Sequence, residues 1–148
     1  MKAGADPNFR DNMQRTALHH AINVGSTSAD ASFEMEELLI KYGADINALD
    51  SRGRTPLHYA FVKIGSPFDY SHIDPVETVT SLCGQKGCNV TIADQWGSTP
   101  LHYAAQRGAH ICALTLINNG AAIDAKDEDG NTPLAIALKC GHPSKKFF

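Results

Sequence analysis

The sequence lacks the motifs by which most catalytic sites are recognised. It contains no glycine-rich phosphate loop, no nucleophile elbow, no His-Glu-x-x-His segment and no clustered pair of carboxylates. No apolar run approaches the ~18 residues that a membrane-spanning helix needs, and Met1-Lys2-Ala3-Gly4 does not start the apolar stretch of a signal peptide. We therefore expect neither catalysis nor a membrane span.

Charge and cysteine spacing argue against a nucleic-acid-binding protein, a disulfide-linked protein and a metalloprotein. A net charge of −3 over 148 residues, of which 43% are hydrophobic, is typical of one compact soluble unit. This weak acidity provides no attraction to nucleic acid. The cysteines at 83, 88, 112 and 140 have no framework spacing, so we expect reduced thiols in the cytosol or nucleus, and no metal or other cofactor.

A short segment recurs along the chain. Thr55-Pro56-Leu57-His58 is repeated as Thr99-Pro100-Leu101-His102, and looser copies begin at Thr16 and Thr132. Each copy follows an Asp-x-x-Gly-like turn, which begins at Asp11, Asp50, Asp94 or Asp127. A second signature, Gly-Ala-Asp or a variant of it, precedes each turn at Gly4, Gly43, Gly87 and Gly120. Such periodic self-similarity predicts a repeat architecture, in which neighbouring units complete each other's core.

The alternation of these two signatures resembles ankyrin repeats over nearly the whole chain. The resemblance implies an all-α solenoid of stacked helix-turn-helix units with β-hairpin-like fingers. We expect one domain, 1–148, made of the end of a repeat (1–10), repeats at 11–49, 50–93 and 94–126, and a partial repeat (127–148). Because neither end shows a polar cap, we expect a fragment of a longer protein, whose uncapped ends would allow oligomerisation.

Two repeats are longer than the family's period. Thr99 and Thr132 lie 33 residues apart, whereas Thr16 and Thr55 are 39 apart and Thr55 and Thr99 are 44 apart. The excess of about six and about eleven residues over the ankyrin period predicts insertions near 25–32 and 65–73, between the two helices of each unit. The second insertion contains Phe68, Tyr70 and His72. These side chains either cover apolar helix surface or form a contact surface for a partner.

Each unit is expected to contain two helices with an apolar side. Threonine caps the first helix and proline occupies its first position, where a missing N–H has no cost. Second helices are predicted at 34–42, at roughly 76–83 and at 111–118, with Met35, Leu38, Leu39 and Leu116 in the core. The resemblance implies that His19, His58 and His102 link neighbouring fingers by hydrogen bonds rather than bind a metal.

Proteins with ankyrin repeats mostly bind other proteins in a groove between the fingers and the first helices. The resemblance therefore implies a non-catalytic interaction module for a peptide or partner loop. Trp, Tyr and Arg are favoured in binding hot spots. The expected contact residues are Met13, Arg15, His20, Arg52, Arg54, Tyr59, Trp96, Tyr103, Arg107 and Asp129. Acidic partner residues would face Arg52 and Arg54, with an apolar anchor near Trp96, unless Trp96 only packs on a neighbouring finger.

Two other functions fit the same groove. Trp96, Tyr103 and Glu128 provide the residue types of an aromatic cage, which would make the domain a methyl-lysine reader for histone tails. Lys63, Arg107 and Trp96 would instead suit a small nucleotide.

One asparagine resembles a site of post-translational modification. Asn47 follows Leu39 by eight residues, as in the pattern used by asparaginyl hydroxylase on ankyrin domains. Thr91 and Asp124 occupy the matching positions of the next two repeats and lack the amide. Alternatively, Asn47 only secures a loop by bonding the backbone, and both interpretations are kept.

Overall fold

The computed structural model describes residues 4–23, 29–62 and 75–142, which contain seven α-helices and no β-strand. The helices are α1 (Ala17–Asn23), α2 (Ala29–Lys41), α3 (Pro56–Tyr59), α4 (Val76–Gly84), α5 (Pro100–Arg107), α6 (His110–Asn118) and α7 (Pro133–Lys139). Phe68, Tyr70 and His72 of the second predicted insertion lie outside the described residues. None of these helices has the length and apolarity needed to cross a bilayer.

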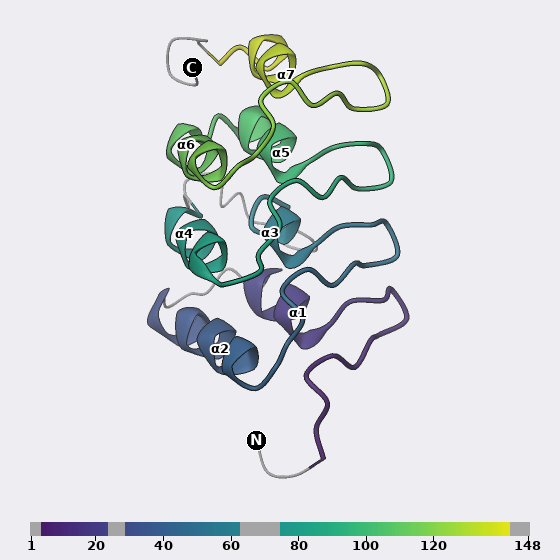
Figure 1. Cartoon of the computed structure of the whole chain (residues 1–148), viewed down its shortest axis with the longest axis vertical. Helices are drawn as coiled ribbons and strands as arrows, with labels where there is room; N and C mark the ends of the chain where they lie inside the picture. Colours follow the sequence, from purple (N-terminus) through teal and green to yellow (C-terminus); the bar gives the residue numbers. More distant parts are fainter. Residues whose placement is uncertain (1–3, 24–28, 63–74, 143–148) are drawn as a thin grey trace.

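The helices stand in two columns, and long loops project to one side of them (Figure 1). We call α1, α3, α5 and α7, which lie beside the loops, the inner helices, and α2, α4 and α6 the outer helices. The first and last described residues lie at opposite ends of the stack. Within the projecting loops, we call the turns at 11–15, 50–54, 94–98 and 127–131 the fingers. This arrangement is the all-helical solenoid that the repeats predict.

The repeated Thr-Pro-Leu-His segment starts the inner helices. Thr55 has extended backbone angles, and Pro56 begins α3. The Nδ1 atom of His58 accepts hydrogen bonds from the Thr55 backbone N–H at 3.1 Å and from its hydroxyl at 2.9 Å. The same two bonds form at Thr16 and Thr99, with His19 and His102. The histidine ring thus adds to a helix start at which only threonine and proline were expected to act.

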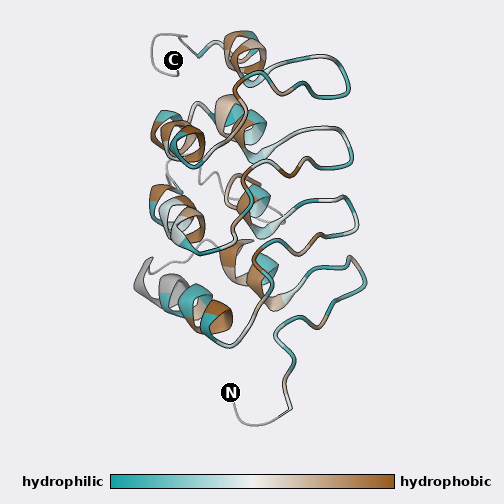
Figure 2. Ribbon diagram, in the orientation of Figure 1, coloured by the Kyte–Doolittle hydropathy of each residue, from teal (hydrophilic) through white to brown (hydrophobic). Residues whose placement is uncertain are grey.

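The core lies between the helices, and the loops are mainly hydrophilic (Figure 2). Leu39 of α2, Leu82 of α4 and Leu116 of α6 are buried in it. The prediction of Met35 and Leu38 as core residues is wrong, because their side chains are 48% and 40% exposed. Successive helical residues differ by about 100° around the axis, so burial of Leu39 turns Leu38 outward.

Helix α2 begins at Ala29 rather than at the predicted Glu34. Alanine has the highest helix propensity of the residues, and Ala29 and Ala31 both precede Glu34. Part of the first predicted insertion is therefore helical, and residues 25–28 lie outside the described residues.

Each finger has one residue with a left-handed backbone, and two of these residues are informative. In the third finger, Gly97 has φ +73°, and a Cβ atom there would lie 3.1 Å from the backbone nitrogen of Glu128. In the first finger, Gln14 occupies the equivalent place with φ 59°, a conformation that costs a residue with a side chain about 1–2 kcal/mol. The first finger therefore keeps the shape of the others at some cost in stability.

Candidate functional site

Each finger is closed by its first residue, an aspartate. The Oδ1 atom of Asp50 accepts hydrogen bonds from the backbone N–H groups of Arg52 and Arg54, both at 2.8 Å. Equivalent pairs of bonds, at 2.8 to 3.0 Å, form at Asp11, Asp94 and Asp127. These aspartates are therefore turn formers, as the sequence predicts.

Backbone hydrogen bonds join each fingertip to the next finger. The carbonyl groups of Met13, Arg52 and Trp96 each accept a bond of 2.8 or 2.9 Å from a residue of the following finger. The donors are Ser51, Gln95 and Glu128. These bonds hold three of the predicted contact residues in one row along the stack, which we call the fingertip row: Met13, Arg52, Trp96 and, in the last finger, Asp129.

Buried histidines make a second set of links between fingers. Because Nδ1 of His58 accepts from a backbone N–H, the ring proton is on Nε2, which donates to the Ser98 carbonyl at 3.0 Å. His19 and His102 bond the carbonyls of Arg54 and Asn131 in the same way. Burial lowers the pKa of His58 to about 4, although the bond to Ser98 opposes this. The linking role predicted for these histidines is confirmed.

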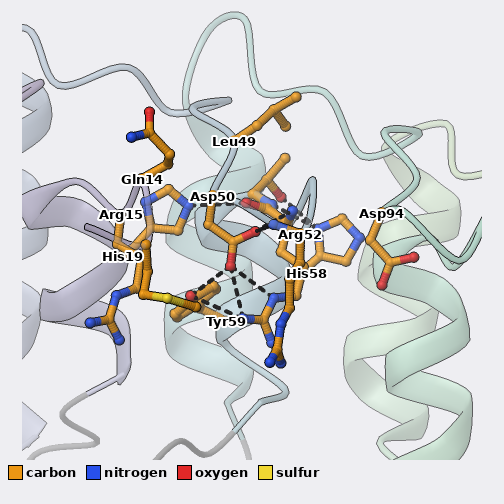
Figure 3. Close-up of polar contacts among 12 residues, drawn as sticks. Gln14, Arg15, His19, Leu49, Asp50, Arg52, His58, Tyr59 and Asp94 are labelled. Carbon is orange, nitrogen blue, oxygen red and sulfur yellow. Dashed lines mark hydrogen bonds and ion pairs between the residues drawn. The ribbon is translucent and has the colours of Figure 1, made fainter. Parts of the chain in front are cut away.

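Arg54 and Tyr59 are not available to a partner. They are 5% and 2% exposed, and both contact Asp50, whose carboxylate lies beside Tyr59 in Figure 3. The Arg54 guanidinium contacts Asp50 Oδ2 at 2.8 Å, and the Tyr59 hydroxyl donates to the same oxygen at 2.8 Å. Although burial opposes ionisation of Asp50, these bonds and that from the Arg54 backbone lower its pKa. Both residues stabilise the second finger, so we withdraw them as contact residues.

His20 and Tyr103 occupy the position of Tyr59 in their own repeats. The His20 ring contacts Asp11 Oδ2 at 2.9 Å, and the Tyr103 hydroxyl donates to Asp94 Oδ2 at 2.6 Å. Burial and this bond raise the pKa of Tyr103 well above its usual value, which keeps its proton in place near neutral pH. Their side chains support the fingers, but His20 is exposed and Tyr103 is half-buried.

Arg52 and Trp96 form the exposed centre of the fingertip row. The Arg52 guanidinium carbon lies 6.0 Å from the centre of the Trp96 ring, at the limit of a cation–π contact. Trp96 is 38% exposed, so it packs on the neighbouring finger and also faces solvent. Among the described residues, no carboxylate forms an ion pair with Arg52. Its positive charge is therefore open to a partner.

Of the other predicted contact residues, two bond to other parts of the domain and two have exposed side chains. Arg15 contacts Asp11 at 2.8 Å, and Arg107 donates to the Phe61 carbonyl at 3.2 Å. Met13 is 40% exposed, and Asp129 is also exposed. Met13 and Asp129 thus extend the open surface at both ends of the row.

The two alternative ligands gain no support from the described residues. The Tyr103 ring meets the edge of the His58 ring at 5.3 Å, and no described ring contact joins it to Trp96. Lys63, expected to hold a nucleotide, lies outside the described residues. The aromatic cage with Glu128 and the nucleotide site stay predictions.

Asn47 joins two neighbouring repeats. Its amide nitrogen donates to the Gly87 carbonyl at 2.8 Å, and its side-chain oxygen accepts from the Asn89 backbone at 2.9 Å. Asn8 makes the equivalent pair of bonds one repeat earlier, to Gly43 and Asp45. The loop-securing role of Asn47 is confirmed, with the loop belonging to the next repeat, while its hydroxylation stays a prediction.

Two features were missed from the sequence. Asn8 could have been recognised, because it holds the place of Asn47 after its own Gly-Ala-Asp signature. The second is the burial of Glu36, which is 1% exposed. Nothing in the sequence indicated it, because a charged residue is expected on the solvent-facing side of a helix. No three His, Cys, Asp or Glu residues in the described ranges could together hold a metal ion.

Comparison with known proteins adds a family match. A family model described as ankyrin repeats (3 copies) matches residues 1–68 and 70–145. A search of curated proteins found no matching relative.

Proposed function

Because the chain belongs to the ankyrin-repeat family, whose members generally mediate protein–protein interactions, we propose that it is a non-catalytic module that binds an extended peptide or a partner loop along the fingertip row. The single observation that carries this proposal is the exposed pair of Arg52 and Trp96. A cation without an ion-pair partner in the described residues lies there beside a large, half-open aromatic ring.

The rigidity of the row supports the proposal. The backbones of Met13, Arg52 and Trp96 are each bonded to the next finger, and the buried histidines fix the fingers from beneath. A surface that is already ordered before binding loses little conformational entropy when a partner arrives. The backbone of this row therefore needs little further ordering to bind.

The side chains indicate the chemistry of the partner. A carboxylate suits Arg52, since charge-assisted hydrogen bonds to guanidinium are strong and often bidentate. An apolar side chain suits the exposed part of Trp96, because aromatic anchors dominate binding hot spots, and a second one suits Met13 on the far side of Arg52. The expected partner segment is extended, with an acidic residue and an apolar residue that contact adjacent fingers. The acidic residue would contact Arg52 only, because Arg54, which was expected to contribute as well, is buried.

A displayed library of random peptides, selected against the wild-type chain, provides defined ligands for a test. The selected peptides should share an acidic residue close to an apolar one. Both Arg52→Ala and Trp96→Ala should weaken their binding about tenfold or more, equal to about 1.4 kcal/mol, as measured by calorimetry.

Gln95→Ala is the matched control, because Gln95 is an exposed neighbour of Trp96 on the same finger. It should leave the affinity unchanged within twofold. If Arg52→Ala and Trp96→Ala also stay within twofold, the fingertip row is not the binding surface.

A further inference from the structure

Helix α2 carries a carboxyl group where the other outer helices carry apolar side chains. Glu36 lies three residues before the buried leucine of its helix. Val79 in α4 and Ala113 in α6 have the same place relative to their leucines, and both are 0% exposed. Glu36 is buried to the same degree, at 1% exposure. The first unit therefore buries an ionisable group at a core position of the stack.

The surroundings of Glu36 provide little to solvate a negative charge. The Thr78 hydroxyl of α4 donates to its Oε1 atom at 3.5 Å, a distance at which a hydrogen bond is weak. Its other oxygen, Oε2, is buried and has no hydrogen-bond partner in the part of the chain that the structure describes. Transfer of a carboxylate from water to such a site is costly, so the neutral acid is the form that fits.

Charged groups on the neighbouring elements do not offset this cost. On α2 itself, Glu34, Glu37 and Lys41 are exposed, and on α4, Glu77 is exposed. On α1, His19 bonds Thr16 and the Arg54 carbonyl, and His20 bonds Asp11. No cation among the described residues forms an ion pair with Glu36.

We propose that Glu36 makes the packing of α2 pH-dependent: the protonated carboxyl is tolerated between α2 and α4, and loss of its proton to solvent loosens α2 from the stack. The first unit, which holds Met13 at one end of the fingertip row, would loosen with it. The device acts whether or not the row binds a partner. It responds to alkalinisation, opposite in sign to the acid response of the buried histidines.

The size of the effect follows from proton linkage. Burial raises the pKa of Glu36 from 4.5 to about 7, with the Thr78 bond opposing the shift. Below pH 4.5 the carboxyl is protonated in both folded and unfolded chains, so it has no differential effect. Between pH 4.5 and 7 it ionises only on unfolding, so stability falls as pH rises, and above pH 7 the loss is constant. The full difference is about 300-fold in the folding equilibrium constant.

Urea unfolding of the wild type and of Glu36→Gln, from pH 4.5 to 8.5, tests this proposal. The buried histidines titrate alike in both chains, so the difference between the two curves isolates Glu36. Glu36→Gln should gain stability relative to the wild type by about 100-fold in the equilibrium constant between pH 5 and 8. Glu36→Val, which introduces the residue found at position 79, should show the same pH dependence of the difference.

Two further measurements locate the effect. Glu37→Gln, a change at the exposed neighbour, should show no pH-dependent difference from the wild type. Hydrogen exchange, corrected for its intrinsic pH dependence, should show loss of protection in α2 as pH rises in the wild type but not in Glu36→Gln, with α6 unaffected in both. A difference that does not vary with pH would overturn the proposal, and so would equal loss of protection in α2 and α6.

Discussion

Replacing Arg54 by methionine tests whether the second finger depends on a buried ion pair. Methionine retains much of the apolar stem but removes the guanidinium, which contacts Asp50 at 2.8 Å and the Tyr59 hydroxyl at 3.2 Å. The Arg54 and Asp50 side chains are 6% and 0% exposed. The substitution would therefore leave a buried carboxylate without its cation.

The first finger provides a matched comparison. Arg15 and Asp11 form the same type of pair at the same spacing and distance, but their side chains are 23% and 31% exposed. Breaking a buried pair from one side costs about 3–5 kcal/mol, whereas an exposed pair contributes up to about 1 kcal/mol. Because Asp50 keeps its bonds from Tyr59 and from two backbone N–H groups, we expect about 3 kcal/mol for Arg54→Met, the low end of the range. Arg15→Met should cost less than about 1 kcal/mol.

Urea denaturation at pH 7, followed by circular dichroism, measures both free energies. For a chain of this length, Arg54→Met should also lower the melting temperature by about 6–12 °C. Equal losses for Arg54→Met and Arg15→Met would refute the reasoning, because burial would then make no difference to the pair.

Three further predictions follow from single contacts. Gln14→Gly should raise the free energy of unfolding by about 1 kcal/mol, because glycine adopts a positive φ without strain. Gly97→Ala should lower it by more than about 1 kcal/mol, because the new Cβ would press on the backbone of the next finger. Urea titrations that rank the two variants in the opposite order would contradict this. His58 is neutral in the fold and has a pKa of about 4 there against 6.5 when unfolded, so its contribution is unchanged above pH 6.5 and up to about 3 kcal/mol is lost as pH falls to 4. His58→Gln should flatten that part of the acid profile, and an unaltered slope would exclude His58 as its source. Asn47→Ala should cost about 2 kcal/mol in thermal or urea unfolding, because two backbone groups of the next repeat lose their partners, and a loss below about 0.5 kcal/mol would show that water replaces the amide.

Local signals in the sequence predicted the repeat unit well. The two Thr-Pro-Leu-His segments start α3 and α5, and the looser copies start α1 and α7. The aspartates close the fingers as expected. The histidine links were expected from the resemblance to ankyrin repeats, and the structure confirms them. The helix starts and the aspartate turns depend on residues within a few positions of each other, whereas each histidine link joins residues 29 to 40 positions apart.

Burial was harder to predict, because it depends on which side of an element meets its neighbour. Leu38 and Leu39 are equally apolar, yet one residue of helical rotation separates exposure from burial. Arg54 and Arg52 lie two residues apart in one finger, yet Arg54 is buried in contact with Asp50 and Tyr59, whereas Arg52 is exposed. Glu36 shows the same limit, because nothing adjacent in sequence marks its position as part of the core.

Hydroxyl-radical footprinting tests the fingertip row as the binding surface most directly. Met13 and Trp96 on the row are 40% and 38% exposed, and Met35 on an outer helix is 48% exposed, so all three should oxidise readily in the free chain. With a selected peptide bound, the account predicts that Met13 and Trp96 are protected while Met35 oxidises as before. Protection of Met35 with unchanged oxidation of Trp96 would contradict it and would move the binding surface to the outer helices.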